Sequence, residues 1–85
     1  MTTTTRTEAL DAAVPGAVIH SVVLGSAGPY GIRSETVATR VGNQITTRAG
    51  TTFNAFTGQE VGPRYPDPFR VIVSDVDADI YRRTL

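Results

Sequence analysis

The period of the hydrophobic pattern changes near residue 16 of the chain. Residues 8–13 have helical spacing behind Thr7, a capping residue type, and the Pro-Gly pair at 15–16 ends this short helix. We therefore expect residues 1–15 to form a flexible N-terminal segment with a short helix. Residues 17–24 are apolar at both odd and even positions, which predicts a strand that is covered on both faces.

Glycine and proline divide the remainder of the chain into strands. Three glycines and a proline in residues 25–31 predict a loop. Residues 32–41 then alternate between apolar and polar, which is typical of a strand with one buried face. A turn at 57–58 and a proline-rich loop at 63–68 lead to a last strand, residues 69–73.

The two hairpins in the middle of the chain are predicted from strand register, because residues paired across an antiparallel hairpin share a face. A two-residue loop at 42–43 would place Arg40 opposite Ile45 and mix the faces. We therefore predict three-residue loops at 42–44 and 49–51. The predicted inner face consists of Val37, Val41, Ile45 and Phe53. The predicted outer face consists of Arg40, Thr46, Arg48, Thr52 and Asn54.

A helix is predicted at the C-terminus, with Ser74 or Asp75 as its cap. Acidic residues stand early in it and two arginines stand late, which suits the helix dipole at both ends. Its apolar stripe is expected to cover the second face of the strand at 17–24, and this stripe consists of Val76, Ile80 and Leu85.

These elements predict a mainly β fold. We expect either a small SH3-like barrel or a five-stranded antiparallel sheet with a short C-terminal helix. The predicted domain is a single β-rich unit, residues 16–85.

Composition narrows the classes of function. An 85-residue chain has room for one domain, and without cysteine it has no disulfide framework and no thiolate metal site. Eight arginines balance eight acidic residues and lysine is absent, so no net positive charge attracts nucleic acid or a membrane. The threonine-rich start lacks the apolar core of a signal peptide. We expect a cytosolic protein.

One internal segment resembles a known group of sequences. Within residues 34–62 the pattern consists of Thr-Val-Ala-Thr-Arg-Val at 36–41, Ile-Thr-Thr at 45–47, Phe53, and Thr-Gly-Gln-Glu-Val-Gly at 57–62. This pattern resembles short uncharacterised proteins encoded by actinobacterial phages and their hosts, although Gln59 stands where those proteins have arginine. The resemblance implies a small β-barrel and a phage or prophage origin. The expected location is then the cytosol of the bacterial host, with location in a virion as an open alternative. The resemblance implies no activity and no functional residues.

Candidate catalytic chemistry is sparse. His20 is the only histidine, and its place in an apolar strand indicates a hydrogen-bonded structural role. The alternating carboxylates at Asp75, Asp77 and Asp79 lack the glycine and the closing glutamate of a calcium loop. No Gly-x-Ser-x-Gly motif is present. We therefore expect no enzyme activity, no cofactor and no metal site.

The remaining hypotheses concern binding. The predicted outer face, with Arg40 and Arg48 as diagonal neighbours, is a candidate interaction face, and Tyr30 and Tyr65 are aromatic residues in adjoining loops. The leading hypothesis is a non-enzymatic accessory protein that binds a host or phage protein. The alternatives are a small nucleic-acid-binding barrel that uses the two arginines, and a self-assembling virion component whose neighbouring subunit covers the apolar strand at 17–24.

Overall fold

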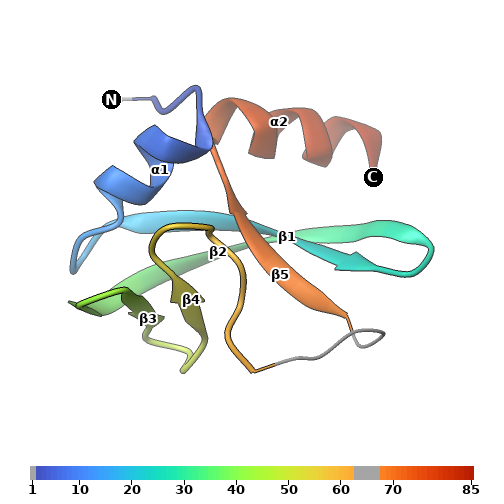
Figure 1. The fold of residues 1–85 in the computed structure, drawn as a ribbon. Coiled ribbons are helices and arrows are strands. Elements are labelled where there is room, and N and C mark those ends of the chain that lie inside the picture. Colours follow the sequence, from blue (N-terminus) through green and yellow to red (C-terminus); the bar gives the residue numbers. More distant parts are fainter. Residues whose placement is uncertain (1, 63–67) are drawn as a thin grey trace.

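The computed structural model describes residues 2–62 and 68–85 and confirms the predicted mainly β fold. Five antiparallel strands form a curled half-barrel sheet (Figure 1). In chain order the elements are α1 (Arg6–Ala12), β1 (Val18–Gly25), β2 (Gly28–Val41), β3 (Gln44–Thr47), β4 (Thr52–Asn54), β5 (Phe69–Val73) and α2 (Asp75–Thr84). Helix α1 packs with the residues inside the half-barrel, and α2 packs on the opposite face of β1 and β5.

The sheet curls until its two edges nearly meet. The strand order is β4-β3-β2-β1-β5, so β4 and β5 are the outer strands. Residues 59–60 connect them, because Glu60 bridges to Phe53 in β4 and Gln59 bridges to Val71 in β5. The long strand β2 turns the corner of the barrel, since it pairs with β1 in its first part and with β3 in its last part.

Strand β1 is buried on both faces, as its sequence predicts. Ile19 points into the half-barrel, where it joins a cluster of buried residues from α1, the sheet and the turn after β4: Ala9, Leu10, Ala13, Val37, Ile45, Phe53, Ala55 and Ile72. Val22 points to the opposite face and packs with Val71, Val73 and Ala78. The strand therefore does not need a neighbouring subunit to cover it, which was the reason given for a self-assembling virion component.

Helix α2 is the predicted cover of the second face, but the predicted stripe is wrong. Ala78 is fully buried and Tyr81 packs beside it against β1 and β5. Val76, Ile80 and Leu85 are instead 37%, 50% and 52% exposed. A small residue at the contact allows the helix to approach the sheet closely, and hydrophobicity alone does not reveal this preference. Ser74 is the cap, with its hydroxyl accepting from the Asp77 N–H.

The segment predicted as a loop at 25–31 is mostly strand. Only residues 26–27 form the turn, and β2 already begins at Gly28. A register shift between Val23 and Leu24 accommodates the glycines and the proline within the ladder. At Gly25 a Cβ would lie 2.2 Å from the Tyr30 ring, so glycine lets this ring lie over the strand.

The predicted three-residue loop between β2 and β3 is also wrong. Val41 pairs with Gln44 and Arg40 pairs with Ile45 around a two-residue turn, in which Gly42 has a φ of 57°. The prediction assumed strict alternation along β2. A register irregularity between Val37 and Thr39 breaks it, so Arg40 points inward and Val41 points outward, 74% exposed.

The second hairpin keeps its predicted inner residues with a different register. Ile45 lies opposite Phe53 and Thr46 lies opposite Thr52, with the turn at residues 48–50 instead of 49–51. The predicted loop at 49–51 would place Thr47 opposite Phe53, so the observed register differs from it by two residues. A shift of two preserves the face of each side chain, and both Ile45 and Phe53 are fully buried as predicted.

The described part of the N-terminal segment packs onto the rest of the molecule. Helix α1 begins two residues earlier than predicted, because Thr5 and not Thr7 is its cap in a reciprocal capping box with Glu8. Leu10 contributes to the barrel core, and Thr3, ahead of the helix, is 92% buried. The Thr3 backbone N–H donates to the Asp75 carboxylate at 2.9 Å.

Candidate functional site

The structure separates the residues of the predicted interaction face. Arg40 points toward α1, where its guanidinium donates to the Leu10 carbonyl and, at 3.3 Å, to the Ala13 carbonyl. It therefore satisfies two carbonyl groups at the C-terminal end of that helix. Arg48 lies in the β3–β4 turn and is exposed. The two arginines are not diagonal neighbours on one face, and this removes the arginine pair on which the nucleic-acid hypothesis depends.

The other predicted face residues have local structural contacts. Thr46 and Thr52 lie opposite one another, with their hydroxyl oxygens 3.2 Å apart. The Asn54 side-chain oxygen accepts hydrogen bonds from the backbone N–H groups of Phe56 and Thr57. These bonds stabilise the turn that follows β4. These three residues do lie on the outer face, but hydrogen bonds within the fold already occupy much of their polar capacity.

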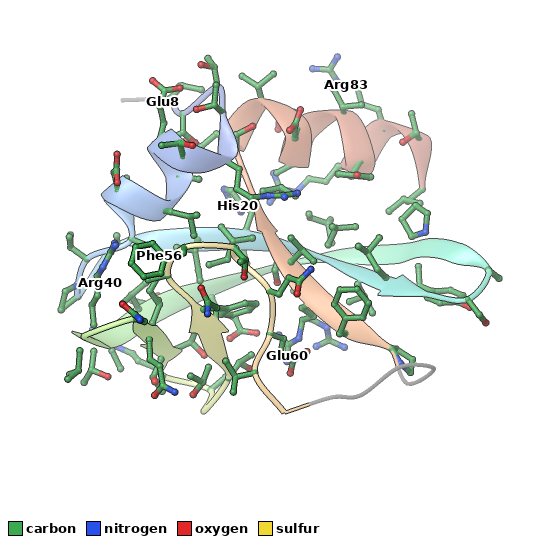
Figure 2. All side chains as sticks on the ribbon, in the orientation of Figure 1. Glu8, His20, Arg40, Phe56, Glu60 and Arg83 are labelled. Carbon is green, nitrogen blue, oxygen red and sulfur yellow. The ribbon has the colours of Figure 1, made fainter. Side chains whose placement is uncertain are left out.

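Of the two predicted aromatic contacts, the structure describes only Tyr30, which does not lie beside this face. Tyr30 lies near the tip of the β1–β2 hairpin, 56% exposed, with its hydroxyl accepting from the Ala27 N–H. Tyr65 falls outside the described residues. Phe56 is exposed in the turn after β4, and Figure 2 shows it at the same end of the molecule as Arg40.

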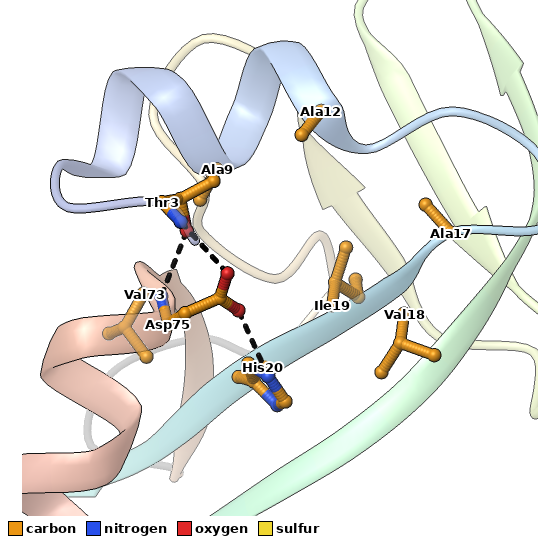
Figure 3. A pocket seen from close by; sticks show the side chains of 9 residues that line it. All are labelled: Thr3, Ala9, Ala12, Ala17, Val18, Ile19, His20, Val73 and Asp75. Atoms are coloured by element: carbon orange, nitrogen blue, oxygen red, sulfur yellow. Dashed lines mark hydrogen bonds and ion pairs between the residues drawn. The ribbon is translucent and has the colours of Figure 1, made fainter. Parts of the chain in front are cut away.

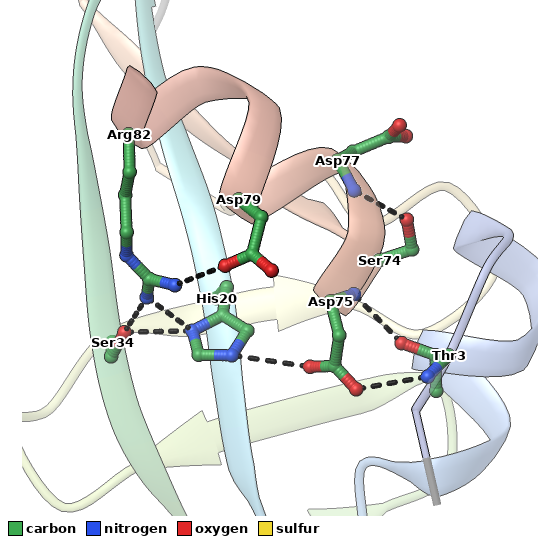
Figure 4. Close-up of polar contacts among 8 residues, drawn as sticks. All are labelled: Thr3, His20, Ser34, Ser74, Asp75, Asp77, Asp79 and Arg82. Atoms are coloured by element: carbon green, nitrogen blue, oxygen red, sulfur yellow. Dashed lines mark hydrogen bonds and ion pairs between the residues drawn. The ribbon is translucent and has the colours of Figure 1, made fainter.

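A polar network joins four segments around His20, which lies in β1 (Figure 4). The His20 Nδ1 atom lies 2.7 Å from the Ser34 hydroxyl in β2, and its Nε2 atom lies 3.1 Å from the Asp75 carboxylate in α2. Arg82, from the same helix, approaches both the Ser34 hydroxyl at 2.9 Å and His20 Nδ1 at 3.1 Å. Asp75 also binds the backbone N–H of Thr3.

A guanidinium only donates, so Arg82 donates to the Ser34 hydroxyl. The Asp75 carboxylate lies beside His20 Nε2, where it accepts the ring N–H when Nε2 carries the proton. Every polar atom named here has a partner, so the network fixes the relative positions of β1, β2 and α2.

The same contacts explain the titration of Asp75. The Thr3 backbone N–H is the main cause that lowers the pKa of the Asp75 carboxyl, and the neighbouring His20 ring acts in the same direction. Burial opposes both effects without reversing the shift. Ionised Asp75 therefore binds the N-terminal segment to the start of α2.

Ser34, His20 and Asp75 are the residue types of a serine-hydrolase triad, a juxtaposition that the sequence did not predict because they lie far apart along the chain. The cavity beside His20, about 180 Å³, is on the side of Asp75 and is lined by Thr3 and by apolar residues of α1 and β1 (Figure 3). Ser34 does not line this cavity. The cavity therefore does not present a substrate to the Ser34 hydroxyl.

A second polar cluster lies inside the half-barrel, between β2 and β5. Arg70 forms an ion pair with Glu35, and its backbone N–H donates to Glu60 at 3.0 Å. The Thr47 hydroxyl donates to the other Glu35 oxygen at 2.5 Å. Burial alone would raise the pKa of Glu35, but the hydrogen bonds from Thr47 and Arg70 together with the Arg70 charge hold it below its ordinary value.

The edge of β2 is the main unpaired backbone feature of the described structure. The register places β1 along residues 28–36 of β2, and β3 begins to pair only at Val37. Among residues 2–62 and 68–85, no strand pairs with the other edge of β2 before that point. The sequence offered no sign of this edge, because its glycines and proline predicted a loop.

The described residues contain no group of three or more histidine, aspartate or glutamate side chains that could hold a metal ion. In this same part of the chain, no helix is sufficiently long and apolar to span a membrane. No family model matches the chain, and neither the curated proteins nor the solved structures include a match.

Proposed function

We propose that this chain is a non-enzymatic accessory protein that binds another protein, of a phage or of its bacterial host, through the β1–β2 hairpin. The observation that supports this proposal is the unpaired edge of β2 at residues 28–35. Unpaired N–H and C=O groups at a sheet edge can hydrogen-bond to a strand of another chain. In Figure 1 the hairpin extends beyond β3 and β4.

The position of the cavity beside His20 supports the non-enzymatic part of the proposal. The His20 ring contacts Ser34 and Asp75, but Ser34 does not line the cavity. A serine nucleophile needs a substrate carbonyl beside its oxygen and donors for the developing oxyanion. The adjoining cavity lies on the opposite side of the His20 ring, beside Asp75.

Site-specific photocrosslinking in cells that naturally express the chain tests the proposal. A benzophenone amino acid replaces Tyr30 at the hairpin or, as the control, Phe56, which is 75% exposed in the turn after β4. Both positions are exposed aromatic residues, so the substitutions are closely matched. We expect a discrete crosslinked protein from position 30 and none from position 56. Equal capture at both positions, or none at either, would contradict the proposal.

A further inference from the structure

We propose that the β2 edge at residues 32–34 binds an extended acidic segment of the partner protein as an additional strand. This inference rests on the proposed function and specifies its binding mode and the chemistry of the partner. Backbone hydrogen bonds would provide the attachment, and a carboxylate opposite Arg33 would provide the preference for acidic sequences.

The backbone contacts around Val37 establish which groups face outward. The N–H and C=O of Val37 bond to residues 16–17, at 2.8 Å each, on the β1 side. The Thr36 carbonyl accepts from Arg48 on the opposite side, at 2.9 Å. Because peptide groups alternate along a strand, Ser34 and Ile32 direct their N–H and C=O groups away from β1. These four groups are available to an incoming strand.

Arg33 supplies the charge preference. It lies between the two outward-facing residues, its side chain is exposed, and no described carboxylate lies within 4.0 Å of its guanidinium. On the other face of the strand, Arg82 contacts Ser34. Arg82 already pairs with Asp79 at 3.4 Å, so the charge preference at this edge comes from Arg33, which favours carboxylates over ammonium groups.

A second copy of this chain is disfavoured by the same arginine. An antiparallel pair that uses the groups of both Ile32 and Ser34 centres on Arg33, which would lie directly opposite its twin. Like charges in that position destabilise a strand pair. Pro29 and the register shift at Leu24 limit pairing nearer the hairpin tip. The edge therefore suits a short segment of a different, acidic protein.

Amide NMR titration with two defined peptides tests the inference. Both probes are capped octapeptides of alternating valine and threonine, one with two central glutamates and one with two central lysines. We expect the glutamate peptide to shift the amide signals of Ile32 and Ser34 saturably and to bind about tenfold more tightly than the lysine peptide. Arg33→Gln should abolish that difference in affinity.

Two substitutions at one position isolate the backbone contribution. Ser34→Pro removes the outward N–H, whereas Ser34→Ala removes the same hydroxyl and keeps the N–H. We expect Ser34→Pro to weaken binding of the glutamate peptide about tenfold or more, and Ser34→Ala to change it less than about threefold. Circular dichroism verifies that both variants are folded, and if Ser34→Pro is not, hydrogen exchange at Ile32 and Ser34 with bound peptide replaces it.

The outcomes separate this inference from the proposed function. Peptide shifts elsewhere on the protein, equal affinity for both peptides, equal effects of the two Ser34 variants, or unprotected Ile32 and Ser34 amides would overturn the edge mechanism. A dimer in light scattering that Ser34→Pro dissociates would overturn the choice of an acidic partner. In each case, a crosslink from Tyr30 in cells would leave the proposed function intact, whereas its absence would contradict that function directly.

Discussion

Replacing Arg40 with alanine should destabilise the fold without removing a binding surface. The sequence pattern placed Arg40 outward beside Arg48, whereas the structure uses it to bind the carbonyl groups of Leu10 and Ala13. Arg48→Ala is the matched control, because Arg48 is exposed in a turn. The two variants remove the same side chain and the same charge, one from strand β2 and one from the β3–β4 turn.

The expected magnitude follows from the contacts of Arg40. Hydrogen bonds from a charged donor contribute about 1.5–3 kcal/mol, and a cation at a helix C-terminus adds about 0.3–1 kcal/mol. Because part of the guanidinium remains solvated, we expect a net loss of about 2 kcal/mol for Arg40→Ala. For a domain of this size that loss lowers the Tm by about 8–16 °C. Arg48→Ala should change stability by less than about 0.5 kcal/mol.

Thermal and urea unfolding, followed by circular dichroism, measure both variants. Hydrogen exchange provides a second readout, since Arg40→Ala should increase exchange in α1 more than in β1 or β5. Equal melting temperatures for the two variants would refute the assignment of Arg40 to the end of α1. Such a result would return Arg40 to the surface and restore the arginine pair of the nucleic-acid hypothesis.

Three further predictions concern the core and the polar networks. Folding lowers the pKa values of Glu35 and Asp75 below their ordinary values of 4.5 and 3.8. The ionised carboxylates therefore stabilise the fold fully above those ordinary values. This stabilisation is lost as the pH falls through the lower pKa values of the folded protein. Stability measured from pH 6 to 2 should therefore decline below about pH 4.5, and less steeply in Glu35→Gln; equal slopes would contradict this. Ala78→Leu should cost about 1–3 kcal/mol by overpacking, whereas Ile80→Ser should cost less than about 0.5 kcal/mol, and the reverse order in urea unfolding would show that the predicted stripe faces the sheet. A fluorophosphonate probe should leave Ser34 unlabelled in mass spectrometry, and stoichiometric labelling would establish an activated nucleophile.

The sequence was informative wherever burial follows from local pattern. Apolar residues on both phases of the strand at 17–24 predicted burial on two faces, and Ile19 and Val22 enter separate clusters. The last strand was predicted with the bounds that β5 has, and the C-terminal helix with Ser74 as one of two candidate caps. Ile45 and Phe53 were predicted as core and are fully buried.

The errors share a physical cause, which is that the predictions assumed uninterrupted periodicity. The irregularity between Val37 and Thr39 exchanges the faces beyond it, so Arg40 turns inward and Val41 outward. Gly28 and Gly31 were assigned to a loop because glycine is rare within strands, yet here β2 contains both. Local sequence does not specify where a ladder accepts an extra residue, since that depends on how the barrel curls.

The sequence by itself determined the fold class, the buried strands and the absence of cysteine chemistry, because each depends on composition or on spacing within one segment. Tertiary structure alone decided which polar groups meet. It brings Ser34 and Asp75 to His20, Glu35 to Arg70, and the N-terminal segment to the start of α2. It also leaves the edge of the first half of β2 unpaired within the described residues, because β3 pairs only with the second half of that strand. Contacts and gaps of this kind arise between distant segments, and no local pattern encodes them.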